Sequence, residues 1–338
     1  MHAMAGSSVL AIGTTIGAVA AMLALAGPGT RPVPSAAARA AVHVSVTPPA
    51  QAGPVHGSVP AQFDPLVPYA AFGWLPKGVT QVGEGTETSS DATSLAASGR
   101  QGSFWLHVMA TGGCGYIRTM LNCHWDSGNV TGPMPLDDRA PDVNGRPAYW
   151  TGGDSVLWEY APGAWAAMDG PAGFNSTPSP ADQALVLKVA AGVRYGYRAP
   201  LVFPFWLSGL PASWSVSTSY FTQPQPPVEA TSLDLGPVQR PQAAQVSVEP
   251  ARGSNTCPFF KGDSTVTLDG VKAIVQGNML CISDLDGQSI SMLLITGYGP
   301  NDAHPVPGAA SIGGVVGLFR HLHLLGSQAS AWTTKPLR

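Results

Sequence analysis

Charged residues are scarce in this sequence. Only 11% of its 338 residues are Asp, Glu, Lys or Arg, and the formal net charge is −3. No stretch accumulates Lys and Arg, so the basic surface that nucleic-acid binding requires is missing. The composition excludes nucleic acid as a partner.

Signatures of catalysis and metal binding are also missing. The sequence has no G-x-S-x-G motif, and no CxxC or HxxxH spacing, so neither a serine nucleophile nor a zinc site is indicated. Asp137, Asp138 and Asp142 lie close together, and paired carboxylates can hydrolyse glycosides, but an exposed acidic loop is the simpler interpretation. His321 and His323 would point to different faces of an expected helix and could not share an ion. We therefore predict no catalytic activity, no cofactor and no metal.

The sequence has one long apolar run, at residues 9–26, which carries no charge. Its length is close to what a membrane-spanning helix needs. Two interpretations stay open: an uncleaved anchor that follows a cytoplasmic start at residues 1–8, or a signal peptide cleaved after Ala26. Both place the remainder outside the cytoplasm, either on a single-pass protein of the cytoplasmic membrane or on a secreted one.

The charges beside this run are unusual. No Lys or Arg precedes it, whereas Arg31 and Arg39 follow it, which is opposite to the positive-inside distribution. We keep the orientation, because large C-terminal domains translocate regardless of such charges. We expect instead that residues ending in a basic cluster precede Met1.

Proline and glycine are abundant, with 32 and 40 residues. Residues 27–64 are rich in Pro, Ala and Gly, which predicts a disordered linker. Beyond it, short motifs recur in the same order. Ala-Thr-Ser-Leu stands at 92–95 and at 230–233, and the hairpin dipeptides Asn144-Gly145 and Asp269-Gly270 occupy corresponding places. This order indicates an internal repeat with copies at 65–198 and 199–326, followed by a tail at 327–338.

Both copies carry strand-like and then helical patterns. Short runs rich in Val, Trp and Leu predict antiparallel strands. Ser179-Pro180 predicts the start of a helix that ends near Gly196. We predict an α+β fold with two tandem domains, each a curved antiparallel sheet with a C-terminal helix packed on it. The apolar faces of the two helices are expected at Leu185, Val189 and Val193, and at Ile312, Val315, Val316, Phe319 and Leu322.

Four cysteines fall two per copy, at Cys114, Cys123, Cys257 and Cys281. Three connectivities are open to them, and export permits disulfides. We expect Cys114 to bond with Cys123, and Cys257 with Cys281. Tryptophans beside the expected strands indicate core packing rather than a carbohydrate- or peptide-binding surface: Trp74, Trp105, Trp150, Trp158, Trp165, Trp206 and Trp214.

The segments Val-Asn-Gly-Arg-Pro-Ala-Tyr-Trp at 143–150, Leu-Trp-Glu-Tyr at 157–160, Gly-Ala-Trp at 163–165 and the helical 189–193 resemble a domain family of uncharacterised function. That family occurs in extracytoplasmic parts of actinobacterial and other Gram-positive membrane proteins, some of them anti-sigma factors, and is similar to the lipoprotein-carrier and RseB group. The resemblance covers about 66–326 as two copies, with Cys281 in place of Trp158.

This resemblance implies a non-catalytic sensing or binding module linked to sigma-factor regulation. It also implies an apolar ligand or a peptide held in the concavity of the sheet. The alternative is a secreted or cell-wall-associated hydrolase or polysaccharide-binding protein.

Overall fold

A computed structural model describes residues 59–81, 87–89, 92–100, 102–112, 114–117, 120–123, 134–135, 138–171, 177, 179–222, 230–237, 242–251, 257, 265–294 and 306–338. The predicted membrane segment at 9–26 lies outside them. Among the described residues, no helix is long and apolar enough to span a membrane.

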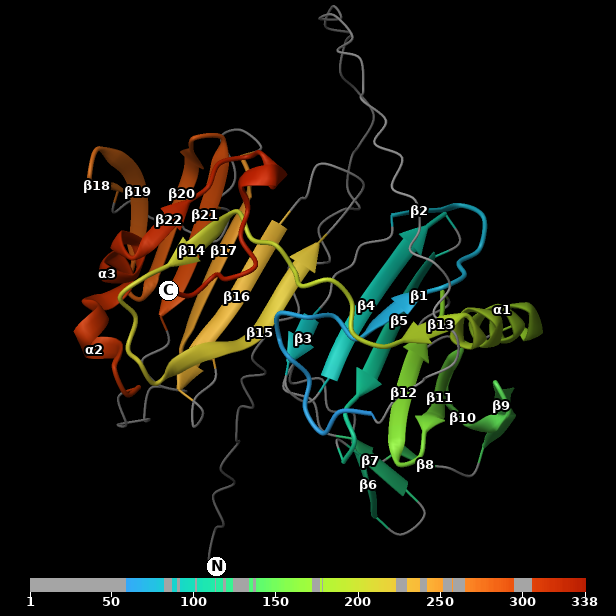
Figure 1. The fold of residues 1–338 in the computed structure, drawn as a ribbon. Helices are drawn as coiled ribbons and strands as arrows, with labels where there is room; N and C mark the ends of the chain where they lie inside the picture. Colours follow the sequence, from blue (N-terminus) through green and yellow to red (C-terminus); the bar gives the residue numbers. More distant parts are fainter. Residues whose placement is uncertain are drawn as a thin grey trace, which may run out of the picture. The chain divides into compact units, whose positions relative to one another are not determined.

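Antiparallel strands dominate the described chain, and helices are few (Figure 1). The main strands of the first half lie in the order β3 (Glu87–Ser89), β4 (Ala92–Gly99), β5 (Gly102–Met109), β12 (Ala164–Asp169), β11 (Ser155–Ala161), β10 (Arg146–Gly152) and β9 (Arg139–Val143). A further strand, β2 (Val79–Gln81), pairs with β4. Strands β6 (Cys114–Ile117), β7 (Met120–Cys123) and β8 (Met134–Pro135) form a separate small sheet.

The second half has the same strand order. It runs β15 (Trp214–Thr222), β16 (Ala230–Pro237), β17 (Ala244–Pro250), β21 (Gln288–Leu294), β20 (Met279–Leu285), β19 (Val271–Gln276) and β18 (Thr265–Leu268). Each half adds one short antiparallel pair, which is β1 (Ala70–Phe72) with β13 (Val193–Tyr195) in the first half, and β14 (Phe205–Leu207) with β22 (Leu322–Leu324) in the second.

The two halves join where β3 pairs antiparallel with β15. Thr88 lies opposite Ser219, and Ser89 lies opposite Thr218. We call this pairing the seam. Through it the main strands form one sheet of 15 strands, rather than two sheets joined only by the chain.

The hairpin turns form at the predicted dipeptides. Asn144 and Asp269 both have a φ of 52°, and Gly145 and Gly270 follow with φ values of 76° and 89°. Two successive positive φ values match the right-handed twist of the flanking strands, which explains why Asn-Gly and Asp-Gly occur there. Each hairpin also contacts the end of the helix in its own half. Asn144 Nδ2 donates to Ala191 O at 3.0 Å, and Asp269 pairs with Arg320 at 3.5 Å.

The helix of the first half, α1 (Pro180–Ala191), begins as predicted. Ser179 Oγ accepts from the Asp182 amide, and the Asp182 carboxylate accepts from the Ser179 amide, a reciprocal arrangement that satisfies two helix-terminal donors. Its end was predicted too late. Gly192 terminates the helix, and Val193 belongs to β13, where it pairs with β1.

The buried face of α1 also differs from the prediction. Val186, Val189 and Ala190 are buried, whereas Leu185 is only partly buried. The second-half helix is interrupted as well. It consists of α2 (Ala309–Ile312) and α3 (Gly314–Arg320), because Gly313 has a φ of 80°. Leu322, expected on the helix, lies in β22.

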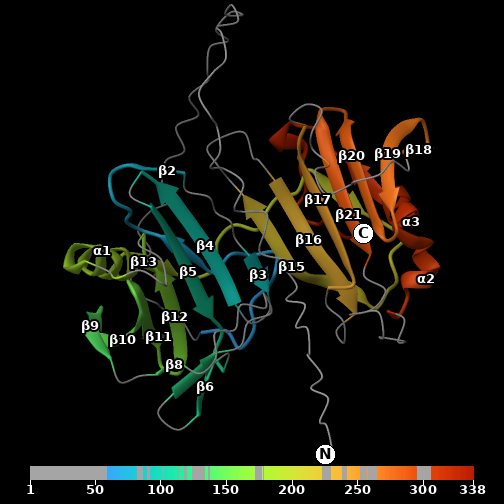
Figure 2. The same ribbon diagram turned by 180° about the vertical axis from the view of Figure 1, so that it is seen from behind.

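Each half has its own hydrophobic core. The first-half core contains Phe104, Leu106 and Trp158 from the strands together with Val186 and Val189 from α1. The second-half core contains Phe203, Leu233, Val246, Ile290 and Leu318. In Figure 1 the pair β14–β22 and the helix α3 lie in front of strands β16 to β21, and in Figure 2 the strands face the viewer. One face of this sheet is therefore covered by short elements of its own half.

Two predicted boundaries are displaced. Phe63, assigned to the linker, is 3% exposed and belongs to the first-half core. Residues 327–338, assigned to a tail, pack on the second half. There Leu337 contacts the second-half core, and Leu207 N donates to Pro336 O at 2.8 Å. Backbone pairing with β14 holds this segment in place.

Candidate functional site

Cys257 and Cys281 form the predicted disulfide, with Cα atoms 6.0 Å apart. Cys281 is 1% exposed on β20, and Cys257 Sγ also lies 3.5 Å from Ser283 Oγ on the same strand. Cys114 and Cys123 face each other directly in the antiparallel register of β6 and β7. Their backbone positions therefore suit a bond across the two strands, and the expectation that they are bonded stays a prediction.

Non-reducing peptide mapping is expected to recover both pairs, Cys114 with Cys123 and Cys257 with Cys281. The reason is proximity, because each cysteine has its predicted partner within its own half. A peptide that links Cys114 or Cys123 to Cys257 would contradict the pairing. The same digest after reduction serves as the control.

The strand register corrects one detail of the resemblance. Leu106 of β5 pairs with Met168, which is followed across the sheet by Val156, while Val246 of β17 pairs with Met292, followed by Leu280. If Leu106 and Val246 are taken as equivalent, Val156 corresponds to Leu280. The next residue along each strand then makes Cys281 the counterpart of Leu157, and Ile282 the counterpart of Trp158. Cys281 therefore lies on the opposite face of the sheet from Trp158.

His107, in the first half, belongs to a polar group on the sheet. Its Nδ1 lies 2.8 Å from Ser94 Oγ on the neighbouring strand. Burial lowers the pKa of His107, and the nearby Asp169 acts in the opposite direction. Asp169 itself accepts from Ser155 Oγ at 2.7 Å. Ser94 lies in the middle of β4 and is only 7% exposed, so its hydroxyl is poorly placed to attack a substrate.

The second half has a counterpart to this pair. Ser94 pairs with His107 in the register of β4 and β5, as Ser232 pairs with Ser247 in that of β16 and β17. Ser247 Oγ donates to Ser232 Oγ at 2.8 Å. Because a histidine and a serine occupy equivalent places in similar hydrogen bonds, we interpret both pairs as cross-strand contacts that stabilise the sheet.

His321 and His323 do not lie on one helix. His321 caps the end of α3, and His323 is in β22, which begins at Leu322. His323 stacks on Trp206 with ring centroids 3.8 Å apart, and its Nε2 lies 2.9 Å from Ser208 Oγ. The argument from opposite helix faces was therefore wrong. Among the described residues, no group of three or more His, Cys, Asp or Glu side chains could hold a metal.

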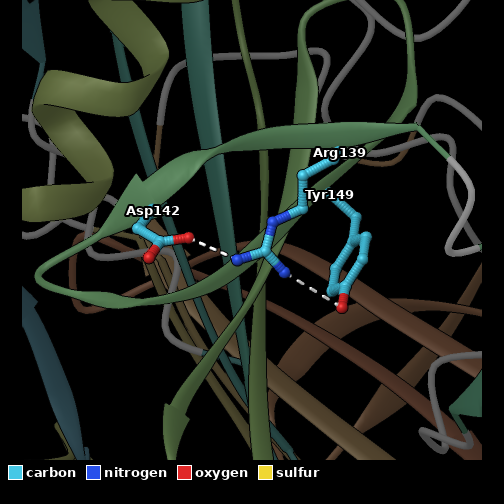
Figure 3. A network of polar contacts seen from close by, with 3 residues as sticks. All are labelled: Arg139, Asp142 and Tyr149. Carbon is cyan, nitrogen blue, oxygen red and sulfur yellow. Dashed lines mark hydrogen bonds and ion pairs between the residues drawn. The ribbon is translucent and has the colours of Figure 1, made fainter.

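The acidic group near residue 140 is only partly described, because Asp137 lies outside the described residues. Asp138 is exposed. Figure 3 shows Arg139 between Asp142 and Tyr149. Arg139 Nη2 donates to Asp142 Oδ1 at 2.5 Å, and Nη1 donates to the Tyr149 hydroxyl at 3.2 Å. All three side chains come from the hairpin of β9 and β10, so this contact orders an exposed surface and engages one of the acids.

The tryptophans divide between core and surface. Trp158, Trp165 and Trp214 are at most 6% exposed. Trp158 Nε1 donates to the Tyr195 hydroxyl at 3.0 Å, which satisfies the indole in a buried place. Burial raises the pKa values of Tyr195 and Tyr160. Trp105, at 40% exposed, departs from the predicted core packing.

Asp234 is the functional candidate that sequence analysis missed. It lies on β16, is 4% exposed, and accepts from Gln245 Nε2 at 3.0 Å. Burial raises its pKa to about 6, although hydrogen bonds from Gln245 and Tyr220 act in the opposite direction. The available signal was a single acid between two leucines in a strand-like run. The equivalent position in the first copy is Ala96, so a comparison of the two copies does not indicate a shared acidic site.

No family model and no curated protein matches this chain. The geometry of the described residues is then the evidence for a function. It shows disulfide-linked sheet architecture, polar groups engaged in cross-strand contacts, and one buried acid beside the seam.

Proposed function

We propose that this chain is an extracytoplasmic sensing or binding module, anchored in the cytoplasmic membrane by residues 9–26 and without catalytic activity. The observation that carries the location is the disulfide between Cys257 and Cys281. Disulfides persist in oxidising compartments and are rare in the cytoplasm. The apolar run at 9–26 provides the matching route of export.

The absence of catalysis is supported by how the polar side chains are used. Ser94 and His107 bond across two strands, and Asp142 pairs with Arg139. Each of these groups is engaged in a contact within the protein. A link to sigma-factor regulation rests on the sequence resemblance alone, and we carry it here as part of the proposal.

The ligand that fits this proposal is an apolar molecule or a peptide. Leu233, Val246 and Ile290 line the sheet face of the second half that belongs to its core, and short helices pack on it. An apolar chain could be held there if α3 moved away from β20 and β21. Native mass spectrometry of protein purified from its own membrane is the direct search for such a ligand.

The anchoring is tested by the N-terminus of the native protein. We expect the protein to stay in the membrane fraction after alkaline carbonate extraction and to retain residues 9–26, because an uncleaved apolar helix leaves the bilayer only with detergent. Protease added to spheroplasts should digest the C-terminal part, and deletion of residues 9–26 serves as the control. A mature N-terminus at Gly27 would instead show cleavage and secretion.

A further inference from the structure

Asp234 is a buried carboxyl group, and no residue of its own strand or of the two strands that flank it is a cation. Its neighbours Leu233 and Leu235 are both 0% exposed. The strands β15, β16 and β17 contain no Lys, Arg or His. Of the described groups on the two flanking strands, Gln245 and Tyr220 hydrogen-bond to the carboxyl. Glu249, the remaining charged group on them, lies further along β17 opposite Ser289. Within the described residues of these three strands, a negative charge at Asp234 therefore has hydrogen-bond donors but no compensating positive charge.

The strand beside Asp234 is irregular at the same level. Val216 pairs with Leu235 and Thr218 pairs with Asp234, so Ser217 is an extra residue in β15. Its hydroxyl donates to the backbone oxygen of Asp234 at 3.2 Å. Such a β-bulge interrupts the hydrogen-bond ladder and bends the strand, and bulges are frequent next to active sites.

The bulge is also where the seam begins. Thr218, directly after Ser217, pairs with Ser89 of β3. The buried carboxyl, the bulge and the start of the seam thus lie at neighbouring positions of β15 and β16. Thr218 pairs with Asp234 on one side and with Ser89 on the other, so a change in the charge of Asp234 is one residue away from the seam.

We propose that Asp234 makes β15 and the seam responsive to protons. In its neutral form the carboxyl fits its buried place, and β15 stays paired with β16 and β3. In its ionised form the charge favours water, and the pairing of β15 loosens at the bulge. This inference rests on the proposed sensing function and names the signal as the acidity outside the cytoplasm.

The direction of the effect follows from the raised pKa of Asp234. A carboxyl whose pKa rises from 3.8 to about 6 on folding binds its proton more tightly in the folded state. The paired form is then most stable below about pH 4, and its advantage is lost as the pH rises through 6. A difference of two pKa units corresponds to about a hundredfold change in the opening equilibrium.

Hydrogen exchange of peptides from 214–237 and 87–99, corrected for the intrinsic pH dependence of exchange, tests the inference on the full chain. In the wild type we expect the protection of these peptides to fall by up to about a hundredfold between pH 4 and 7.5. Asp234→Asn should keep protection high and nearly constant, because the amide carries no charge. Asp142→Asn, at an exposed carboxylate, should behave as the wild type. Gln245→Met removes a donor that stabilises the ionised carboxylate, so the pKa of Asp234 should rise further. The total loss of protection between pH 4 and 7.5 should then be larger than in the wild type.

Constant protection in the wild type would overturn the inference, and so would an equal loss in Asp234→Asn. If Asp234→Asn does not fold, the Asp234 carboxyl can be titrated by NMR in the wild type, and an apparent pKa near 4 would equally overturn it. A cleaved, secreted chain would overturn the anchoring alone and leave these outcomes unchanged.

Discussion

Leu318→Asp is expected to unfold the second half of the chain under conditions in which the first half stays folded. Leu318 is 0% exposed in the second-half core, and a carboxylate there would have to be buried without a partner or force the site open. The cost is expected to exceed about 4 kcal/mol. Val186→Asp, at 0% exposed in the first-half core, is the reciprocal experiment.

Hydrogen exchange resolved by peptide provides the measurement. Leu318→Asp should remove protection from β16, β17, β20 and β21, while β4, β5, β11 and β12 keep theirs. Matched controls are Ala310→Asp and Ala184→Asp, which add the same charge at exposed positions of α2 and α1 and should cost little. If either core variant removes protection from all strands equally, the two halves form one cooperative unit and the separation into two cores has no energetic meaning.

Replacing Cys257, Cys281 or both with alanine is expected to destabilise the second half by roughly 3 kcal/mol, because the bond closes a loop with a sequence separation of 24. The informative comparison is between the variants. Loss of the bond is common to all three, so Cys281→Ala and the double variant, which share the truncation at Cys281, should have similar midpoints in urea.

Cys281 is also 1% exposed, so its truncation leaves a small cavity as well. Adding a reductant to the wild type should reproduce the Cys257→Ala result, and Ser283→Ala serves as a control that keeps the bond. A much larger loss in Cys281→Ala than in Cys257→Ala would show that packing, and not the cross-link, dominates.

Features set by neighbouring residues were predictable from the sequence. The turns at Asn144 and Asp269 depend on which residues tolerate positive φ, and the start of α1 depends on Ser179 and Asp182. The end of α1 was not predictable in this way. Val193 continues the apolar spacing of the helix, but its backbone is taken by β1, a strand more than a hundred residues earlier.

The same reason explains the missed site. Whether Asp234 is exposed or buried depends on β15 and β17 pairing on both sides of it, and no local pattern reports that. The disulfide partner of Cys281 could be proposed from its place in the second copy. Its correspondence to Leu157 required the register of six strands.

The seam has a consequence for how the two copies coexist. Reading outward from β3 and β15, both directions give the same strand order. Such an order results when two copies of one subunit associate about a twofold axis through the same edge strand. Joining them in one chain replaces a bimolecular encounter with an intramolecular one at high effective concentration, so the contact no longer depends on abundance. The two copies in one chain can also differ in sequence. Ala96 and Asp234 occupy equivalent positions in the shared strand order, and only one of them is an acid. A subunit paired with itself would carry the buried acid on both sides, whereas the fused chain carries it on one.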